Sequence, residues 1–176
     1  MKELDKERII QRYNVRLEKF GDDIRTLASG NEDRRKIRFD TLVELGLVSG
    51  VSVLDLGCGF GDLYDYLQTR GLSVDYTGFD INPNLIEIAR KRHPQVKFEI
   101  LDIQIDEFPS FDFIVSSSAF NLRMENGSNY EFAEDILRRC YEHARKGVAV
   151  DFLSSYVDYE SAEAFHYSPE KIFSIA

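Results

Sequence analysis

A turn that carries three glycines is the part of the sequence best suited to hold a ligand. Residues 53–61 read Val-Leu-Asp-Leu-Gly-Cys-Gly-Phe-Gly, an apolar run that enters the turn. Gly57, Gly59 and Gly61 let the backbone adopt positive φ and let a ligand approach the main chain closely. Asp80 ends the next apolar run, where a carboxylate can accept hydrogen bonds from both hydroxyls of a ribose. The two features together predict a site for a ligand that contains adenosine.

The spacing of the glycines distinguishes among such ligands. In the dinucleotide fingerprint the third glycine follows the second by three positions. Counted from Gly59, that position is Asp62, and the third glycine is Gly61 instead. A carboxylate at the start of a helix suits the helix dipole, but it would repel a pyrophosphate. We therefore expect a ligand without phosphate that carries a cationic amino group, and a nicotinamide-dependent oxidoreductase is the weaker alternative.

Three further segments lie at or near the ends of predicted strands. They are residues 78–81 (Gly-Phe-Asp-Ile), 101–103 (Leu-Asp-Ile) and 111–118 (Phe-Asp-Phe-Ile-Val-Ser-Ser-Ser). In their order and spacing, these segments and residues 53–61 resemble the class I S-adenosylmethionine-dependent methyltransferases, over about residues 35–155. The resemblance implies a Rossmann-like methyltransferase fold, with S-adenosyl-L-methionine as the cofactor that donates the methyl group and S-adenosyl-L-homocysteine as the product.

The resemblance also implies which residues contact the cofactor. Asp55 and the glycine turn line the methionine part and the ribose, Asp80 binds the ribose hydroxyls, and Asp102 takes the adenine amino group. A purine needs an apolar slot with an acceptor at its edge, and an ammonium group needs oxygen atoms, so the residue types fit. With Arg38 added for the carboxylate of the ligand, the predicted cofactor-binding residues are Asp55, Gly57, Cys58, Gly59, Asp80, Ile81, Asp102, Ile103, Ser117, Ser118 and Arg38.

Local backbone roles are the alternative for several of these side chains, because Asp and Ser often bond to nearby main chain. Asp102 could belong to a turn, and Asp55 could tie its loop together by accepting backbone N–H bonds. Ser117 or Ser118 is expected to offer a carbonyl oxygen to the amino group of the cofactor. Both serines could instead cap a helix around residues 121–123.

Two arginines before the first predicted strand suit an anionic group. Arg34 or Arg38 could reach the carboxylate of the cofactor as a charge-assisted partner, and exposure to solvent is the alternative for both. His93, beside Pro94 at a helix end, is predicted to lie on the surface. No spacing of His, Cys and acidic residues indicates a metal site.

Methyl transfer from a sulfonium needs positioning more than it needs a reactive side chain. The donor is already activated, and alignment of the reactants can be worth about 7–11 kcal/mol. A base is needed only when the acceptor still holds a proton at neutral pH, so we assign no catalytic residue. Candidates for the acceptor side follow the fourth and fifth predicted strands, where the aromatic rings form either a lid or ordinary packing: Ser116, Phe120, Asn121, Arg123, Asp151, Tyr156, Tyr159 and His166.

The charge balance argues against a polyanionic partner. The 176 residues carry a formal net charge of −9, so DNA or RNA would be repelled on average. No apolar stretch approaches the roughly 20 residues that span a bilayer, the charged N-terminus is unlike a signal peptide, and two cysteines make no disulfide framework. These features predict a cytoplasmic protein that acts on a small-molecule acceptor, with neither nucleic acid nor membrane as a partner.

Alternating strands and helices must position the candidate residues. After two N-terminal helices, at 3–20 and 32–45, strand patterns and helix patterns alternate along the chain. Such alternation predicts a three-layer α/β/α sandwich with a mostly parallel, doubly wound sheet. The predicted strands are 51–55, 74–79, 96–101, 111–116 and 148–153, and the predicted helices between them are 62–69, one that starts at Asn82-Pro83, and 130–145.

The end of the chain lacks the two strands with which the family usually completes its sheet. Only loop and a helix start at Ser168-Pro169 follow the fifth strand. We expect a single domain over 1–176, with N-terminal helices at 1–46, a core at 47–155 and a tail at 156–176. The tail is either truncated, or another subunit covers the exposed sheet edge in a homo-oligomer. A non-catalytic or truncated cofactor-binding domain is therefore the main alternative to an active enzyme.

Overall fold

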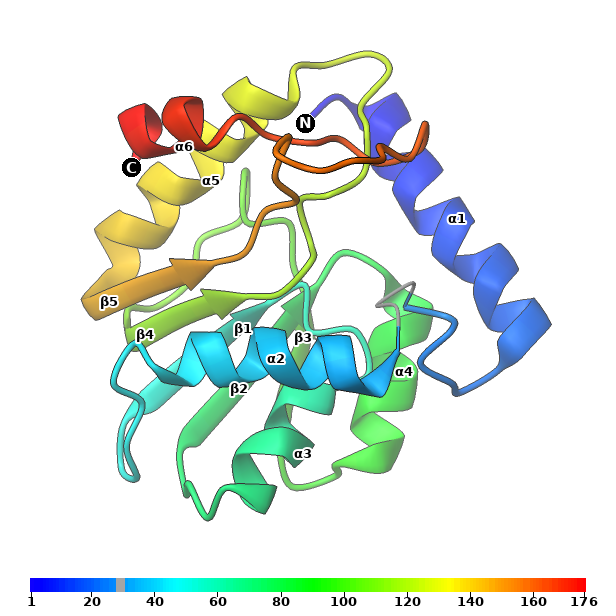
Figure 1. Ribbon diagram of the computed structural model, residues 1–176. Helices are drawn as coiled ribbons and strands as arrows, with labels where there is room; N and C mark the ends of the chain where they lie inside the picture. Colours follow the sequence, from blue (N-terminus) through cyan, green and yellow to red (C-terminus); the bar gives the residue numbers. More distant parts are fainter. Residues whose placement is uncertain (28–30) are drawn as a thin grey trace.

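Five parallel strands form one sheet in the computed structural model, which describes residues 1–27 and 31–176 (Figure 1). The strand order β3-β2-β1-β4-β5 places β1 at the centre, and the chain winds from β1 first toward β3 and then toward β5. This is the doubly wound sheet that the alternation predicts. The elements are α1 (Glu3–Phe20), α2 (Glu32–Val43), β1 (Ser52–Leu56), α3 (Asp62–Thr69), β2 (Asp75–Asp80), α4 (Pro83–Arg92), β3 (Lys97–Ile100), β4 (Phe111–Ser116), α5 (Asn129–His143), β5 (Ala144–Val150) and α6 (Pro169–Ile175).

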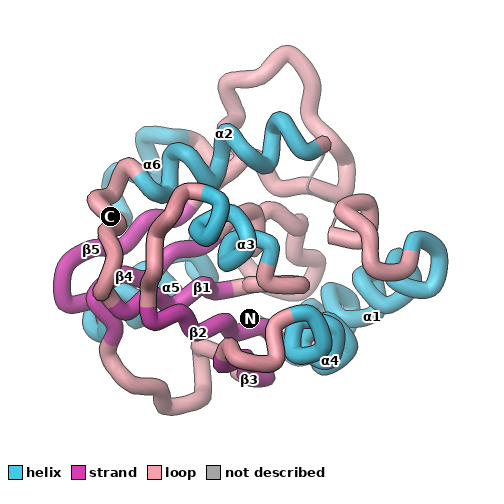
Figure 2. Tube along the Cα trace, turned by 90° about the horizontal axis from the view of Figure 1, so that it is seen from below, coloured by secondary structure: helices cyan, strands magenta, loops and turns pink. Residues whose placement is uncertain are grey.

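Side chains of β1 alternate between two cores, one on each face of the sheet. Val53 packs in a core that includes Leu42 of α2 and Leu63 of α3. Leu54 packs in a second core with Ile136 of α5. Because successive side chains of a strand point to opposite faces, the apolar run of β1 is buried on both sides. The molecule therefore has the predicted α/β/α layers, and Figure 2 shows α2 and α3 together on one side of the strands.

The topology places a crevice at the carboxyl end of β1. Asp55 of β1 is paired with Gly78 of β2 on one side and with Val115 of β4 on the other. The strand order reverses at this point, and the loops that follow β1 and β4 lead away in different directions. Open α/β sheets bind ligands in the crevice that this divergence leaves. The glycine turn and the serines after β4 both belong to it.

Helix α4 begins where its sequence signals predict. The side chain of Asn82 accepts the backbone N–H of Asn84 at 2.9 Å, and Pro83 occupies the first turn. This cap lies two residues after Asp80. The corner that carries the candidate ribose carboxylate is therefore fixed by a helix start.

Strand β5 begins four residues earlier than predicted, and α5 ends at His143 rather than at residue 145. Ala144 is already paired with Phe111. The charged residues that follow are satisfied across the sheet, because Arg145 and Lys146 both form ion pairs with Asp112 at 3.1 and 3.4 Å. Such ion pairs between strands cannot be recognised from a pattern of apolar residues. The predicted strand at 148–153 therefore begins too late in the sequence.

The expectation that His93 lies on the surface is wrong. The residue is only 6% exposed, and its ring lies 5.2 Å from that of Tyr64 and 6.0 Å from that of Phe98, measured between centroids. His93 ends α4 with a non-helical backbone. Its side chain joins the aromatic packing between α3 and β3.

The tail after β5 packs against the loop that follows β4. Arg123 N–H donates to the carbonyl of Glu163 at 3.0 Å, and Phe165 N–H donates to that of Asn121 at 2.9 Å. Tyr167 is 1% exposed. In Figure 1 this segment passes above the sheet toward α1. The tail aromatics thus divide, because Tyr167 packs inside while Tyr156 and Tyr159 are exposed. Among the residues described, no strand pairs with the outer edge of β5.

Helix α1 lies beside the carboxyl end of the sheet and contacts both sides of the crevice. Asn14 Oδ1 accepts from Asn82 Nδ2 at 3.1 Å. The fully buried Asp5 accepts the backbone N–H groups of Glu125 and Asn126 at 2.9 and 3.1 Å. These contacts join α1 to the start of α4 and to the loop before α5. None of the described helices has the length and apolar character needed to cross a membrane.

Candidate functional site

The glycine turn depends on its glycines. Gly57 and Gly59 have φ of 76° and 55°, which side chains rarely allow. A Cβ on Gly57 would lie 2.6 Å from Cβ of Ala119, so the turn after β1 and the segment after β4 touch here. The N–H groups of Gly57 and Cys58 both donate to the carbonyl of Phe79, at 2.7 and 3.0 Å. The turn is thereby tied to the end of β2, and the side chain of Leu27 packs against Gly59, where a Cβ would lie 3.0 Å from Leu27 Cδ2.

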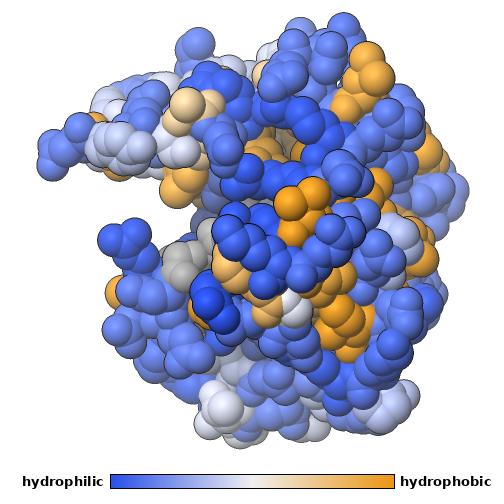
Figure 3. All heavy atoms as spheres, turned by 90° about the vertical axis from the view of Figure 1, so that its right-hand side faces the viewer, coloured by the Kyte–Doolittle hydropathy of each residue, from blue (hydrophilic) through white to orange (hydrophobic). Residues whose placement is uncertain are grey.

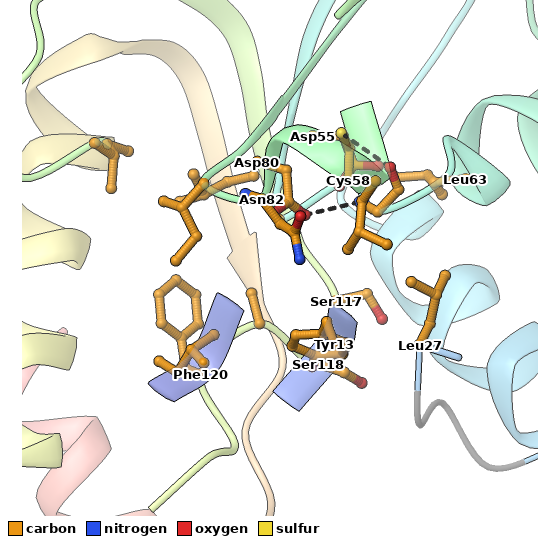
Figure 4. Close-up of a pocket in the computed structure, with 18 of the residues that line it drawn as sticks. Tyr13, Leu27, Asp55, Cys58, Leu63, Asp80, Asn82, Ser117, Ser118 and Phe120 are labelled. Atoms are coloured by element: carbon orange, nitrogen blue, oxygen red, sulfur yellow. Dashed lines mark hydrogen bonds between the residues drawn. The ribbon is translucent and has the colours of Figure 1, made fainter. Parts of the chain in front are cut away.

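Asp80 is held by the main chain around it. Its Oδ2 accepts the N–H of Gly59 at 3.0 Å and its Oδ1 accepts that of Asn82 at 2.9 Å. Burial raises the pKa of Asp80, and the N–H groups of Asn82, Gly59 and Ile81 oppose that rise. In Figure 4, Asp80 lies beside Asn82, across the cavity from Ser117 and Ser118. The carboxylate faces the cavity, with an orientation fixed by two backbone donors.

Asp55 is bonded to a side chain rather than to its own loop. The hydroxyl of Tyr76 donates to Asp55 Oδ2 at 2.5 Å. Burial is the main reason that the pKa of Asp55 is raised to about 7, and the hydrogen bond from Tyr76 opposes the rise. Asp55 is thus a titratable carboxyl group on the wall of the cavity near neutral pH.

Asp102 both stabilises a turn and lines the cavity. Its Oδ1 accepts the N–H of Gln104 at 3.1 Å, which is the turn contact that the sequence left open. Its Oδ2 forms an ion pair with Lys6 of α1 at 2.9 Å. The carboxylate therefore lines the cavity with one oxygen bonded to a turn N–H and the other paired with a lysine.

The two serines after β4 do not cap a helix, because residues 121–123 form none. The hydroxyl of Ser117 donates to Asp151 at 2.8 Å, and the N–H of Ser118 donates to the same carboxylate at 2.6 Å. Arg38 Nε lies 3.4 Å from Ser117 Oγ. Burial raises the pKa of Asp151 and lowers that of Arg38.

The acid that opens α3 is neutralised by two arginines. Asp62 forms ion pairs with Arg35 and with Arg92, the latter at 2.7 Å. Its charge alone is therefore a weaker argument against a pyrophosphate than the sequence suggested. The glycine spacing and the cavity lining carry the distinction instead.

All of the sequence-predicted cofactor residues line one cavity. They come from α2, from the end of β1 and the turn after it, from the end of β2, and from the loops after β3 and β4. The cavity wall includes Arg38, Asp55, Gly57, Cys58, Gly59, Asp80, Ile81, Asp102, Ile103, Ser117 and Ser118. The glycine cradle, the acceptors near the ends of β2 and β3, and the apolar residues between them fit an adenosine that carries a charged amino-acid end.

Sequence reasoning missed the residues that cover this cavity. Met1, Ile9 and Tyr13 reach it from the N-terminal segment, and Phe132 reaches it from α5, whereas Phe120, which also lines the cavity, was among the acceptor-side candidates. Figure 4 draws Tyr13 among the side chains that line the cavity. The surface on the α1 side is hollowed, with mostly hydrophilic residues around the hollow (Figure 3). The apolar face of α1 was visible in the sequence, but no local signal told which part of the sheet it would cover.

Comparison with known proteins identifies relatives. A family model for the methyltransferase domain matches residues 53–147, more than half of the chain. A Mycobacterium tuberculosis protein described as a methyltransferase is 35% identical over 115 residues, which are 61% of this chain and 66% of that protein. The malonyl-[acyl-carrier protein] O-methyltransferase of Acetivibrio thermocellus is 35% identical over 82 residues, which are 45% of this chain and 29% of that enzyme. The chain thus matches less than two thirds of the length of each.

Solved structures share the fold. The magnesium protoporphyrin IX methyltransferase of Synechocystis PCC 6803, solved with S-adenosylhomocysteine, aligns with a TM-score of 0.71 and 17% identity over 97% of this chain and 86% of that one. An S-adenosylmethionine-dependent methyltransferase from Clostridium acetobutylicum aligns with a TM-score of 0.63 and 16% identity over 93% and 85%. From the family match and this fold, the chain belongs to the class I S-adenosylmethionine-dependent methyltransferases, whose cofactor is S-adenosylmethionine.

Proposed function

We propose that this chain transfers a methyl group from S-adenosylmethionine to a small-molecule acceptor. The observation that carries the proposal is the convergence of Asp55, Asp80, Asp102 and the Ser117–Ser118 segment on one cavity beside a glycine cradle. These residues lie on separate strands and loops. Their meeting supplies acceptors for a ribose, an adenine amino group and an ammonium group within one ligand.

In this proposal the residues of the chain bind and align the two reactants. Bound S-adenosylmethionine supplies a methyl group that its sulfonium has already activated. Asp80 accepts the ribose hydroxyls, Asp102 accepts the adenine amino group, and Arg38 pairs with the carboxylate. Alignment of this kind is worth about 7–11 kcal/mol. The cavity needs no nucleophilic side chain, and we assign none.

The acceptor is inferred from this chain rather than from its relatives, because the relatives act on different molecules. One methylates a malonyl group on acyl-carrier protein, and a structural neighbour is named for magnesium protoporphyrin IX. Here the net charge of −9 disfavours nucleic acid, and α1 covers the cavity with Ile9 and Tyr13. Both features favour a compact metabolite. We place the protein in the cytoplasm, where its buried thiols stay reduced.

A non-catalytic or truncated cofactor-binding domain is the alternative that the sequence left open, and the comparisons with known methyltransferases do not favour it. The sheet ends at β5 among the described residues, and the chain matches 66% and 29% of two relatives. We take residues 1–176 as a single cofactor-binding domain. Its β5 edge is the surface through which we expect a homo-oligomer to form, and sedimentation of the purified chain tests that expectation.

Calorimetry tests the cofactor assignment. We expect binding of S-adenosylmethionine and S-adenosylhomocysteine, and none of NAD. Asp80→Ala removes the ribose acceptor and should weaken S-adenosylhomocysteine binding by roughly tenfold or more. Asp75→Ala, at the exposed opposite end of the same strand, is the matched control and should bind as the wild type does. Unchanged affinity in Asp80→Ala contradicts the assignment.

Product formation separates the two candidates. The chain is incubated with S-adenosylmethionine and a panel of small metabolites, and S-adenosylhomocysteine is quantified. An acceptor-dependent increase supports a methyltransferase. If the chain binds the cofactor, stays monomeric and forms no additional S-adenosylhomocysteine with any metabolite of the panel, the result favours the non-catalytic domain.

A further inference from the structure

Asp151, the residue that follows β5, supports the cavity without belonging to its wall. We propose that Asp151 is a positioning residue, which holds the Ser117–Ser118 turn and Arg38 in the arrangement that receives the amino-acid end of the cofactor. The inference rests on the proposed cofactor site. It explains why β5, which contributes no residue to the cavity wall, matters for binding.

Each oxygen of the Asp151 carboxylate has its own partner in the turn. The N–H of Ser118 donates to Oδ1 at 2.6 Å, and the hydroxyl of Ser117 donates to Oδ2 at 2.8 Å. The main chain completes the clamp, because Asp151 N–H donates to the carbonyl of Ser116 at 3.2 Å. The turn after β4 is therefore fastened to the strand beside it at three points.

The turn needs this clamp because its backbone is strained. Ser118 has φ of 63°, and among the described residues it is the one non-glycine with positive φ. A side chain disfavours this left-handed conformation, so a free turn would relax. Ala119, the next residue, sits against Gly57 with no room for a further carbon atom. Relaxation of the turn would therefore move the wall that faces the glycine cradle.

The same carboxylate also places a cation. Arg38 Nε lies 3.8 Å from Asp151 Oδ2 and 3.4 Å from Ser117 Oγ, and Arg38 lines the cavity. Carbonyl oxygens of the turn can accept from an ammonium group, and the guanidinium can pair with a carboxylate. One partly buried carboxylate behind the wall thus orders both halves of a receptor for an α-amino acid.

Two ligands isolate this role. S-adenosylhomocysteine carries the amino-acid end, and 5′-methylthioadenosine lacks it. We expect Asp151→Asn to weaken S-adenosylhomocysteine binding by roughly tenfold and to leave 5′-methylthioadenosine binding within about twofold. Asp112→Asn is the matched control. Asp112 likewise accepts a backbone N–H and pairs with arginine, at the opposite end of β4, and its change should affect neither ligand.

A second change tests the strain directly. Glycine adopts positive φ without cost, so Ser118→Gly in the Asp151→Asn background should recover part of the lost affinity for S-adenosylhomocysteine. Ser117→Ala, which removes a single donor to the clamp, should weaken the same ligand selectively by a smaller factor. If the Asp151→Asn variant does not fold, Ser117→Ala still tests the role of the clamp.

Three results overturn the inference. They are equal weakening of both ligands by Asp151→Asn, unchanged affinity for S-adenosylhomocysteine, and no recovery by Ser118→Gly. Failure of the cofactor assignment looks different, because the wild-type chain would then bind neither ligand. The two failures are therefore distinguished by the wild-type titrations alone.

Discussion

Lys6 of α1 forms an ion pair with Asp102 in the loop after β3, with 2.9 Å between Lys6 Nζ and Asp102 Oδ2. The side chains are 22% and 12% exposed. The pair links the N-terminal helix to the residue that we expect to recognise adenine, and it lies where solvent screens it little. The hydrogen bond that Lys6 donates to Asp102 is the main reason that the pKa of Lys6 is raised.

We predict that Lys6→Met lowers the free energy of unfolding by about 1–3 kcal/mol, because it leaves a partly buried carboxylate without its cation. Urea unfolding measures the change. Lys91→Met is the control, since the Lys91–Glu87 pair on α4 is exposed on both sides and should contribute less than about 0.5 kcal/mol. Equal losses in the two variants would show that the Lys6 pair is an ordinary surface contact.

Gly57→Ala should cost much more than Gly71→Ala. Both glycines have positive φ, 76° and 68°, so both substitutions introduce backbone strain of about 1–2 kcal/mol. A Cβ at Gly71 meets nothing within 4 Å, whereas one at Gly57 collides with Ala119 at 2.6 Å. We expect an additional loss of about 1–3 kcal/mol in Gly57→Ala, seen by denaturant unfolding, and a loss of S-adenosylhomocysteine binding. Similar unfolding midpoints for the two variants would contradict the close contact.

Asp55 should make the protein less stable as pH rises toward neutrality. The folded state holds a proton on Asp55 up to a pKa of about 7, whereas an unfolded aspartic acid releases it near pH 3.9. Between these values the folded state binds more protons, so the free energy of unfolding falls as pH rises, by up to about 1.4 kcal/mol per pH unit. Above about pH 7 both states are ionised and this contribution stops changing.

Asp55→Asn removes that titration and keeps an acceptor for Tyr76. Relative to the wild type, the variant should gain stability steadily between about pH 5 and pH 7, measured by urea unfolding at several pH values. Asp75→Asn, at an exposed position of β2, should follow the wild-type profile. A parallel pair of profiles for Asp55→Asn and the wild type would mean that Asp55 is ionised throughout.

Tyr167→Phe should destabilise the protein although Tyr167 lies in the tail. Its hydroxyl donates to the buried carbonyl of Phe120 at 2.9 Å, and removing it leaves that carbonyl without this donor, at a cost of about 1–3 kcal/mol. Tyr159→Phe, on a side chain that is 80% exposed, is the control and should change little. Thermal unfolding compares the two, and equal melting temperatures would indicate that the tail is not docked.

The sequence predicted the site where its signals are local. Gly57 and Asp80 are recognisable because a strand, a turn and a helix start follow one another within a short stretch, and parallel strands bring such stretches to one edge of the sheet. The start of helix α4 at Asn82 is recognisable for the same reason. In each case the position of the residue follows from its neighbours in the sequence, or from the parallel sheet that the alternation of strands and helices predicts.

Features that depend on distant partners were not predictable. The cover formed by Ile9 and Tyr13 depends on where α1 docks, which contacts such as Asp5 with the loop at residue 125 decide. His93 is buried by Phe98 and Tyr64 rather than by anything in its own helix. The hydrophobic periodicity of a sequence does not predict which side chains come into contact when they are more than a hundred residues apart.

The open edge of β5 has a dynamic consequence. A strand with one neighbour leaves alternate amide groups without an internal acceptor, so their hydrogens exchange with solvent at lower opening cost than those of the central strand. Asp151 directly follows this strand. When the amino-acid end of the cofactor binds, we therefore expect slower amide hydrogen exchange along the edge strand β5 (Ala144–Val150). The exchange rates of β1 should not change.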